Sequence, residues 1–226
     1  MLENYFLMRH CEDKTRTLPA YLSKMLLKYD CIITTNWDTL AERILLINNR
    51  WNPSDGYGFQ VSLMEYDGVH NDKDKTYFPS EVKVLKLHGS IGWHQRDGLF
   101  YLRYSSYLQY LLGNVCDPND PRHGPDEDPV ILHPSYLKQL DNPILLSVWE
   151  NARIYIEEAE SVSIVGYSLP KADVAIRALL LPIRRKLVDV EIINPFTQGD
   201  ETKRRWEEFL GKLPRYVALT AAEHYR

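Results

Sequence analysis

Four short runs of β-branched and apolar residues, each closed by small or polar residues, constrain this fold most. They occupy residues 31–35, 82–87, 162–166 and 188–193. Runs of this length and composition are typical of strands buried on both faces. Segments with helical spacing of apolar residues lie between and around them. The alternation predicts an α/β protein whose parallel sheet carries helices on both faces.

The helical segments and the region between residues 91 and 142 set the expected domain organisation. Helices are predicted over 18–29, 38–48, 143–159, 170–186 and 199–211, with a weak last strand over 215–219. With 226 residues and 44% apolar side chains, the chain can bury a core as a single domain over residues 1–226. We expect a core over about 18–90 and 143–220, with a small inserted subdomain over about 91–142. In the insertion, the spacing of tyrosines predicts a helix that packs the subdomain rather than a platform for bases. These tyrosines are Tyr101, Tyr104, Tyr107 and Tyr110.

Charge and cysteine usage exclude several classes of protein. The formal net charge is -4 and no basic face is evident, so nucleic acid is not an expected partner. No apolar run is long enough for a membrane span, and the first residues do not resemble a secretory signal. Cys11, Cys31 and Cys116 are far apart and form no C-x-x-C pair, so no zinc is expected. Free thiols fit a reducing, cytoplasmic location.

Polar or small residues follow all four predicted strands. The first run leads into Thr35, Asn36 and Asp38, the second into His88 and Gly89. The third leads into Gly166, Tyr167 and Ser168, and the fourth into Asn194. Because ligands of open parallel sheets bind at the carboxyl ends of the strands, we expect one crevice lined by all four ends.

Each of these residues also has a structural interpretation. Asp38 is placed to cap the following helix, with Ala41 at its third position. His88 could be a hydrogen-bonded core histidine. Gly166 could serve close packing of strand and helix, and Asn194 could belong to an ordinary turn. The joint placement at strand ends favours the functional interpretation over these.

Three sequence blocks together resemble the sirtuin-like (silent information regulator 2-like) family, most closely its prokaryotic branch. The blocks are IITTNWDTL at 32–40, LKLHGSI at 85–91 and IVGYSLPKAD at 164–173. Trp149, in the helix before the third block, also fits, and the resemblance covers about residues 20–220. It implies a Rossmann-like (DHS-like NAD/FAD-binding) fold that takes NAD as a substrate.

The resemblance also implies roles for individual residues. His88 would be the general base on the ribose hydroxyls, Asn36 would orient water or the ribose, and Asp38 would hold the nicotinamide amide. A neutral imidazole can accept such a proton as the sugar becomes cationic. The residues expected to bind the nucleotide are Thr35, Gly89, Gly166, Tyr167, Ser168 and Asn194.

Two family features are missing from this sequence. The zinc cysteines of protein-deacylating sirtuins are absent, which favours the branch that hydrolyses NAD, often in antiviral defence. A Gly-Ala-Gly-x-Ser loop ahead of the first block is also absent, since no glycine precedes Leu18. We therefore expect a sheet without one central strand, and NAD hydrolase activity if such a glycine loop is supplied.

The sequence leaves several functions open. The first is an NAD+ glycohydrolase, the second a catalytically impaired or truncated nucleotide-binding or interaction module. An NAD-dependent protein deacylase is less favoured. The expected partners are NAD or an ADP-ribose-like nucleotide, and an oligomer or a sensor domain stays open.

Overall fold

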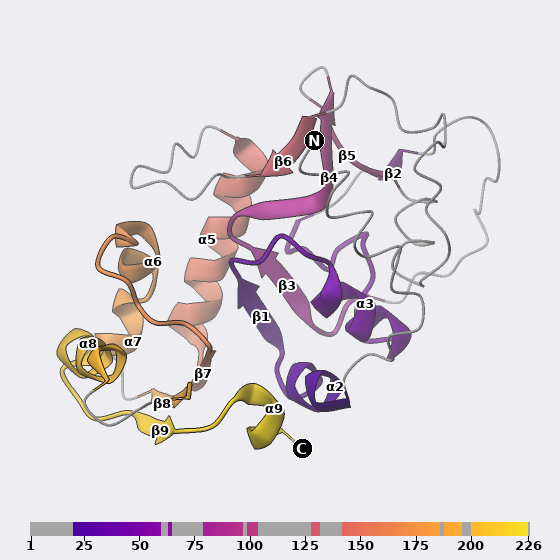
Figure 1. Ribbon diagram of the computed structural model, residues 1–226. Helices are drawn as coiled ribbons and strands as arrows, with labels where there is room; N and C mark the ends of the chain where they lie inside the picture. Colours follow the sequence, from indigo (N-terminus) through magenta and orange to yellow (C-terminus); the bar gives the residue numbers. More distant parts are fainter. Residues whose placement is uncertain are drawn as a thin grey trace.

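Strands alternate with helical segments over residues 20–47 and 143–224, as the hydrophobic pattern predicts, whereas the elements described between them are all strands (Figure 1). The computed structural model describes residues 20–59, 63–64, 79–96, 99–103, 128–131, 142–185, 188–195 and 200–225. Its helices are α2 (Ala20–Leu26), α3 (Leu40–Ile47), α5 (Pro143–Glu158), α6 (Val174–Leu179), α7 (Leu181–Arg185), α8 (Glu201–Leu210) and α9 (Ala221–His224). Its strands are β1 (Cys31–Thr34), β2 (Leu63–Met64), β3 (Lys83–Lys86), β4 (Gly89–Arg96), β5 (Leu99–Arg103), β6 (Asp128–Ile131), β7 (Ser161–Val165), β8 (Asp189–Ile193) and β9 (Arg215–Val217). They form an α/β fold with parallel sheets.

The first parallel sheet is the pair β1–β3. Its register runs from Cys31 opposite Lys83 to Thr34 opposite Lys86. Helix α5 packs against β3 on one side and against α6 and α7 on the other (Figure 1). The apolar residues of β3 lie in the core between these layers, which fixes the strand that leads to His88.

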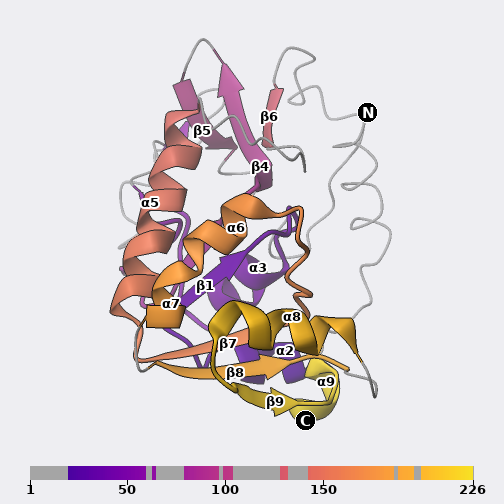
Figure 2. The ribbon, with the colours of Figure 1, turned by 90° about the vertical axis from the view of Figure 1, so that its left-hand side faces the viewer.

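The second parallel sheet has the order β7-β8-β9. Val165 lies opposite Ile193, and Ile193 lies opposite Val217. Helices α6, α7 and α8 gather beside these strands (Figure 2). Within the described residues, no strand pairs with the second edge of β1 or of β7. The single parallel sheet that the sequence predicts is therefore present here as two separate parts.

A third sheet is mixed and has the order β2-β5-β4-β6. Strand β4 is antiparallel to both β5 and β6, whereas β2 is parallel to β5. An edge-to-face contact of Trp93 in β4 with Tyr57, at 4.9 Å between ring centroids, ties this sheet to the core. Tyr57 in turn contacts Trp51 at 5.0 Å. The assignment of residues 91–142 to an inserted subdomain remains a prediction.

Two sequence predictions about the insertion and the helices need correction. Tyr101 lies on β5, so the predicted tyrosine helix is wrong there; the other three tyrosines lie outside the described residues. The helix predicted over 170–186 begins only at Val174 and is divided into α6 and α7. Pro182 in the first turn of α7 lacks the backbone N–H that would continue one helix. Strands β2, β4, β5 and β6 and helix α9 were not predicted.

None of the helices in the described residues is long and apolar enough to cross a membrane.

Candidate functional site

The ends of β1 and β3 bring the first two sequence blocks together. The Leu87 N–H donates to the Thr34 carbonyl at 2.9 Å, which adds one rung beyond the paired strands. Thr35 and His88 therefore follow the same end of the same strand pair. His88 is buried, with 7% of its surface exposed. The predicted meeting of these two strand ends is confirmed.

The loop of residues 35–39 is ordered by its own short hydrogen bonds. The Asn36 N–H donates to Thr34 Oγ1 at 3.0 Å, and the Leu40 N–H donates to Asp38 Oδ1 at 3.0 Å. The N-cap of α3 is Thr39, whose side chain makes no capping bond. The prediction that Asp38 caps this helix is thus one residue off, although its carboxylate does accept an N–H of the first turn. Asn36 is exposed and Asp38 is half-buried.

Two further contacts hold the segment around His88. The Ser90 hydroxyl donates to the Trp37 carbonyl at 3.4 Å and so links the start of β4 to the loop. Trp149 of α5 donates its Nε1–H to the Leu87 carbonyl at 2.8 Å. The side chain that fits the family resemblance thus fixes the backbone directly before His88.

Gly89 has a structural reason to follow His88. Its φ is +78°, in the left-handed region, and a Cβ would lie 1.9 Å from the Val130 carbonyl oxygen. Gly89 pairs with Ile131 of β6 at this close approach. Only glycine fits both the conformation and the space.

The ends of β7 and β8 bring the other candidate residues together. The Gly166 N–H donates to the Ile193 carbonyl at 3.0 Å, and the Asn194 N–H donates to the Val217 carbonyl at 3.1 Å. Gly166 has a φ of +69°, and a Cβ there would meet no atom within 4 Å. Close packing therefore does not explain this glycine. Its conformation does, and the space beside it is open.

Helices α6 and α8 hold the segment after β7. The Tyr167 hydroxyl donates to Asp173 Oδ2 at 2.8 Å, and Trp206 Nε1 donates to the Tyr167 carbonyl at 3.1 Å. Arg205 Nε donates to the Ser168 carbonyl at 3.1 Å. Burial and the bond to Asp173 raise the pKa of the Tyr167 phenol, so it stays protonated at neutral pH. The Tyr167 hydroxyl is thus engaged within the fold.

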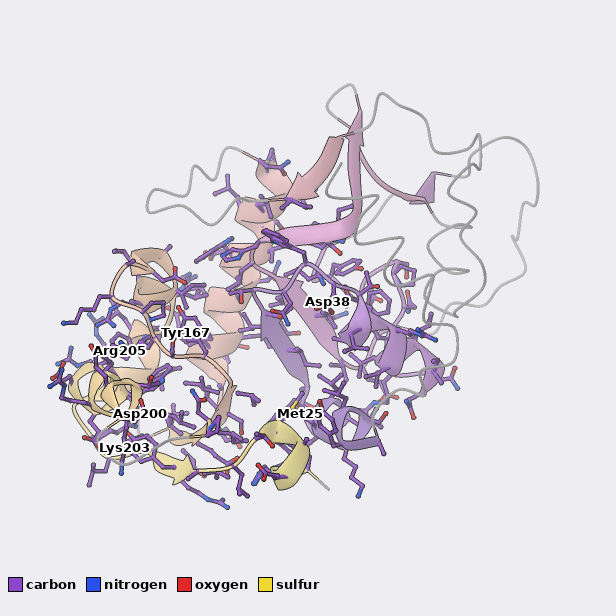
Figure 3. All side chains as sticks on the ribbon, viewed as in Figure 1. Met25, Asp38, Tyr167, Asp200, Lys203 and Arg205 are labelled. Carbon is purple, nitrogen blue, oxygen red and sulfur yellow. The ribbon has the colours of Figure 1, made fainter. Side chains whose placement is uncertain are left out.

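The candidate residues form two clusters. We call Thr35, Asn36, Asp38, His88 and Gly89 the β1–β3 cluster, and Gly166, Tyr167, Ser168 and Asn194 the β7–β8 cluster. Figure 3 shows Asp38 beside the β1–β3 pair and Tyr167 on the other side of it, among α6 and α8. The sequence predicted one crevice lined by all four strand ends. In the described chain they belong to separate sheets rather than to one continuous edge.

A buried ion pair near the β1–β3 cluster was missed by the sequence reasoning. Lys86 Nζ lies 3.0 Å from Glu42 Oε1, and the two side chains are 1% and 0% exposed. The signal available was the place of Lys86 between Leu85 and Leu87, which are both core residues.

No metal site is evident in the part of the chain that the structure describes. No group of three or more His, Cys, Asp or Glu side chains there could hold an ion. Cys31 is a half-buried free thiol. Burial and the neighbouring Asp30 raise its pKa to about 12, so it stays protonated and unreactive at neutral pH. Cys11 and Cys116 lie outside the described residues.

Comparison with known proteins identifies the family. The SIR2-like domain matches residues 30–189, which include the β1–β3 cluster and Gly166 to Ser168 but not Asn194. A crystal structure of Sir2 with the inhibitor EX-527, 2'-O-acetyl-ADP-ribose and deacetylated p53 peptide is 15% identical. The match covers 93% of this chain and 69% of the Sir2 chain, at a TM-score of 0.48. A structure of Sir2Tm bound to a propionylated peptide is 16% identical, and the match covers 92% of this chain and 68% of the Sir2Tm chain at a TM-score of 0.48. No curated protein matches. The chain belongs to the SIR2-like domain family, and it is an NAD-binding domain of that family.

Proposed function

We propose that this chain hydrolyses NAD+ at the bond between nicotinamide and ribose. The reaction takes NAD+ and water to nicotinamide, ADP-ribose and one proton. One observation carries the proposal: the β1–β3 pair places a buried imidazole, His88, and an exposed amide, Asn36, at the same strand end. A base and a group that orients water are what this hydrolysis requires.

The groups of the β1–β3 cluster fit the nicotinamide and ribose half of NAD. Among the described residues, the Asn36 side-chain amide has no hydrogen-bond partner, so it is available to a ligand or a water. Bound NAD would supply the bond to be broken and a cationic leaving group. His88 would accept a proton from a ribose hydroxyl, and Asn36 would orient the attacking water. Asp38 would accept the carboxamide N–H through Oδ2, since its Oδ1 already accepts from Leu40.

The β7–β8 cluster would hold the adenosine half. The open space at Gly166 lets a ligand approach the backbone there, and Ser168 and Asn194 would bind phosphate and ribose. Tyr167 would contribute through its ring or backbone, since its hydroxyl is bound to Asp173. Thr35 and Gly89 would contribute beside the nicotinamide ribose. Such an activity would consume NAD in the cytoplasm, in keeping with the antiviral role that the resemblance implies.

The test measures nicotinamide release from NAD+ by the purified chain, with chromatography as the assay. We expect His88→Ala to lower the rate by about 10²- to 10⁴-fold, the usual contribution of a general base. Asn36→Ala should lower it too. Lys83→Met, on the same strand but away from the cluster, is the control and should keep the rate. No release by the wild type, or equal release by the His88 variant, would exclude the proposal.

A second candidate function is nucleotide binding without turnover. It is favoured by the separation of the two clusters into two sheets within the described residues. Titration calorimetry with ADP-ribose distinguishes the two. If the wild type binds ADP-ribose but releases no nicotinamide from NAD+, and the binding survives His88→Ala, the result would support this function over hydrolysis.

A further inference from the structure

The core beneath the β1–β3 cluster contains a network of titratable side chains. Lys86, the last residue of β3, pairs with Glu42 of α3 at 3.0 Å between Nζ and Oε1. The Tyr57 hydroxyl donates to the same Glu42 oxygen at 3.3 Å. All three side chains are buried. Among the described residues, Glu42 Oε2 has no hydrogen-bond partner, so the network is not arranged for maximal hydrogen bonding of its carboxylate.

Stability alone is a weak reason for such a pair. Removing two charges from water costs more than a well-packed apolar pair of similar volume would, and apolar replacements are often neutral or stabilising. Burial raises the pKa of Glu42, and the nearby Lys86 ammonium counteracts that rise. The contact with Glu42 also limits the positions that the Lys86 side chain can take.

Lys86 Nζ also donates a hydrogen bond to the backbone carbonyl of Asp38. That carbonyl lies in the loop of residues 35–39, which carries Asn36 and the Asp38 carboxylate. Lys86 itself lies two residues before His88. One side chain therefore connects the two segments whose relative position defines the β1–β3 cluster.

We propose that Lys86 is a positioning residue: oriented by Glu42 and Tyr57, its ammonium holds the Asp38 carbonyl and so fixes the 35–39 loop relative to His88. The consequence for catalysis rests on the proposed NAD hydrolysis, whereas the consequence for the loop does not. A displacement of about 1 Å between two catalytic groups can lower the rate about 10²-fold.

The same strand offers a matched control. Lys83 pairs with Asp55 at 2.8 Å and also donates to the Asp55 carbonyl at 3.1 Å. Its side chain and that of Asp55 are 21% and 25% exposed. Lys83 thus makes the same two kinds of bond as Lys86, but to a segment outside the cluster.

The test compares three variants with the wild type. Glu42→Leu/Tyr57→Phe/Lys86→Met replaces every polar group of the network with apolar groups of similar size. Lys86→Arg keeps the positive charge and a donor, and Lys83→Met is the control. For each we would measure the thermal midpoint, hydrogen–deuterium exchange of the amides of residues 36–40, and kcat and KM for NAD+.

We expect the triple variant to keep its thermal midpoint, to exchange the amides of 36–40 about tenfold faster, and to lose about 10- to 100-fold in kcat with little change in KM. Lys86→Arg should recover part of both losses, and Lys83→Met should show neither. Unchanged exchange at 36–40, faster exchange throughout the core, or an unfolded triple variant would overturn the proposal. If the wild type releases no nicotinamide, the proposed function fails, and the exchange data still decide the role of Lys86.

Discussion

Alanine at Gly89 is the most informative single perturbation of the β1–β3 cluster. Gly89 and Gly166 both have a φ in the left-handed region, +78° and +69°. A residue with a Cβ in that region costs about 1–2 kcal/mol. The two positions differ in space: at Gly166 the added Cβ meets nothing within 4 Å, whereas at Gly89 it lies 1.9 Å from the Val130 oxygen. Gly166→Ala therefore measures the conformational cost by itself.

The steric cost at Gly89 follows from which atoms lie nearby. Real Cβ contacts are not shorter than 3.0 Å, so the Val130 carbonyl must move by at least 3.0 − 1.9 = 1.1 Å. The neighbouring atoms are backbone atoms of β6, which cannot rotate away as a side chain can. We expect a total of about 3–5 kcal/mol for Gly89→Ala, which is within the range of severe core substitutions.

The assay is urea denaturation of both variants, supported by thermal unfolding. Gly89→Ala should lose at least about 2 kcal/mol more than Gly166→Ala, and at about 2–4 °C per kcal/mol its thermal midpoint should fall correspondingly further. Because β4 begins directly after His88, nicotinamide release by folded Gly89→Ala should fall as well. Equal free energies of unfolding for the two variants would refute the reasoning from the Val130 contact.

Two further predictions concern the supports of the same strand. Burial alone would raise the pKa of Asp55, but hydrogen bonds from Lys83 and Ser80 hold this pKa below its usual value. The ionised carboxylate therefore stabilises the fold above about pH 4, and this contribution is lost as the pH falls through the lowered pKa. Asp55→Asn should thus cost at most about 1 kcal/mol at neutral pH and nearly nothing near about pH 2, checked by urea denaturation at both; an equal loss at both would contradict this sign. Trp149→Phe removes the 2.8 Å hydrogen bond to the Leu87 carbonyl and should lower the free energy of unfolding by about 0.5–1.5 kcal/mol. It should also lower nicotinamide release more than Lys83→Met does. Unchanged values in both assays would show that this hydrogen bond does not support His88.

Local sequence patterns predicted the elements that depend on local forces. The run at 31–35 became β1, and the amphipathic stretch at 143–159 became α5 with Asn142 as its N-cap. Strands β2, β4, β5 and β6 were missed. Their hydrogen bonds join residues far apart in the sequence, as Gly89 with Ile131, and such pairing leaves little periodic signal. Tyr101 shows this directly: its spacing indicated a helix, but pairing with β4 places it in a strand.

The sequence by itself determined which residue types stand at the strand ends and, through three short blocks, the SIR2-like family. These depend on residue identity and order along the chain. Only the tertiary structure decided that the segments carrying Asn36, Asp38 and His88 follow one strand pair while those carrying Gly166 and Asn194 follow strands of another sheet, since this depends on which strand pairs with which. It also decided that Lys86 and Glu42 are buried together. A charged residue in a strand or helix is usually exposed to solvent, and only the contact between Lys86 of β3 and Glu42 of α3 shows that these two are buried as a pair.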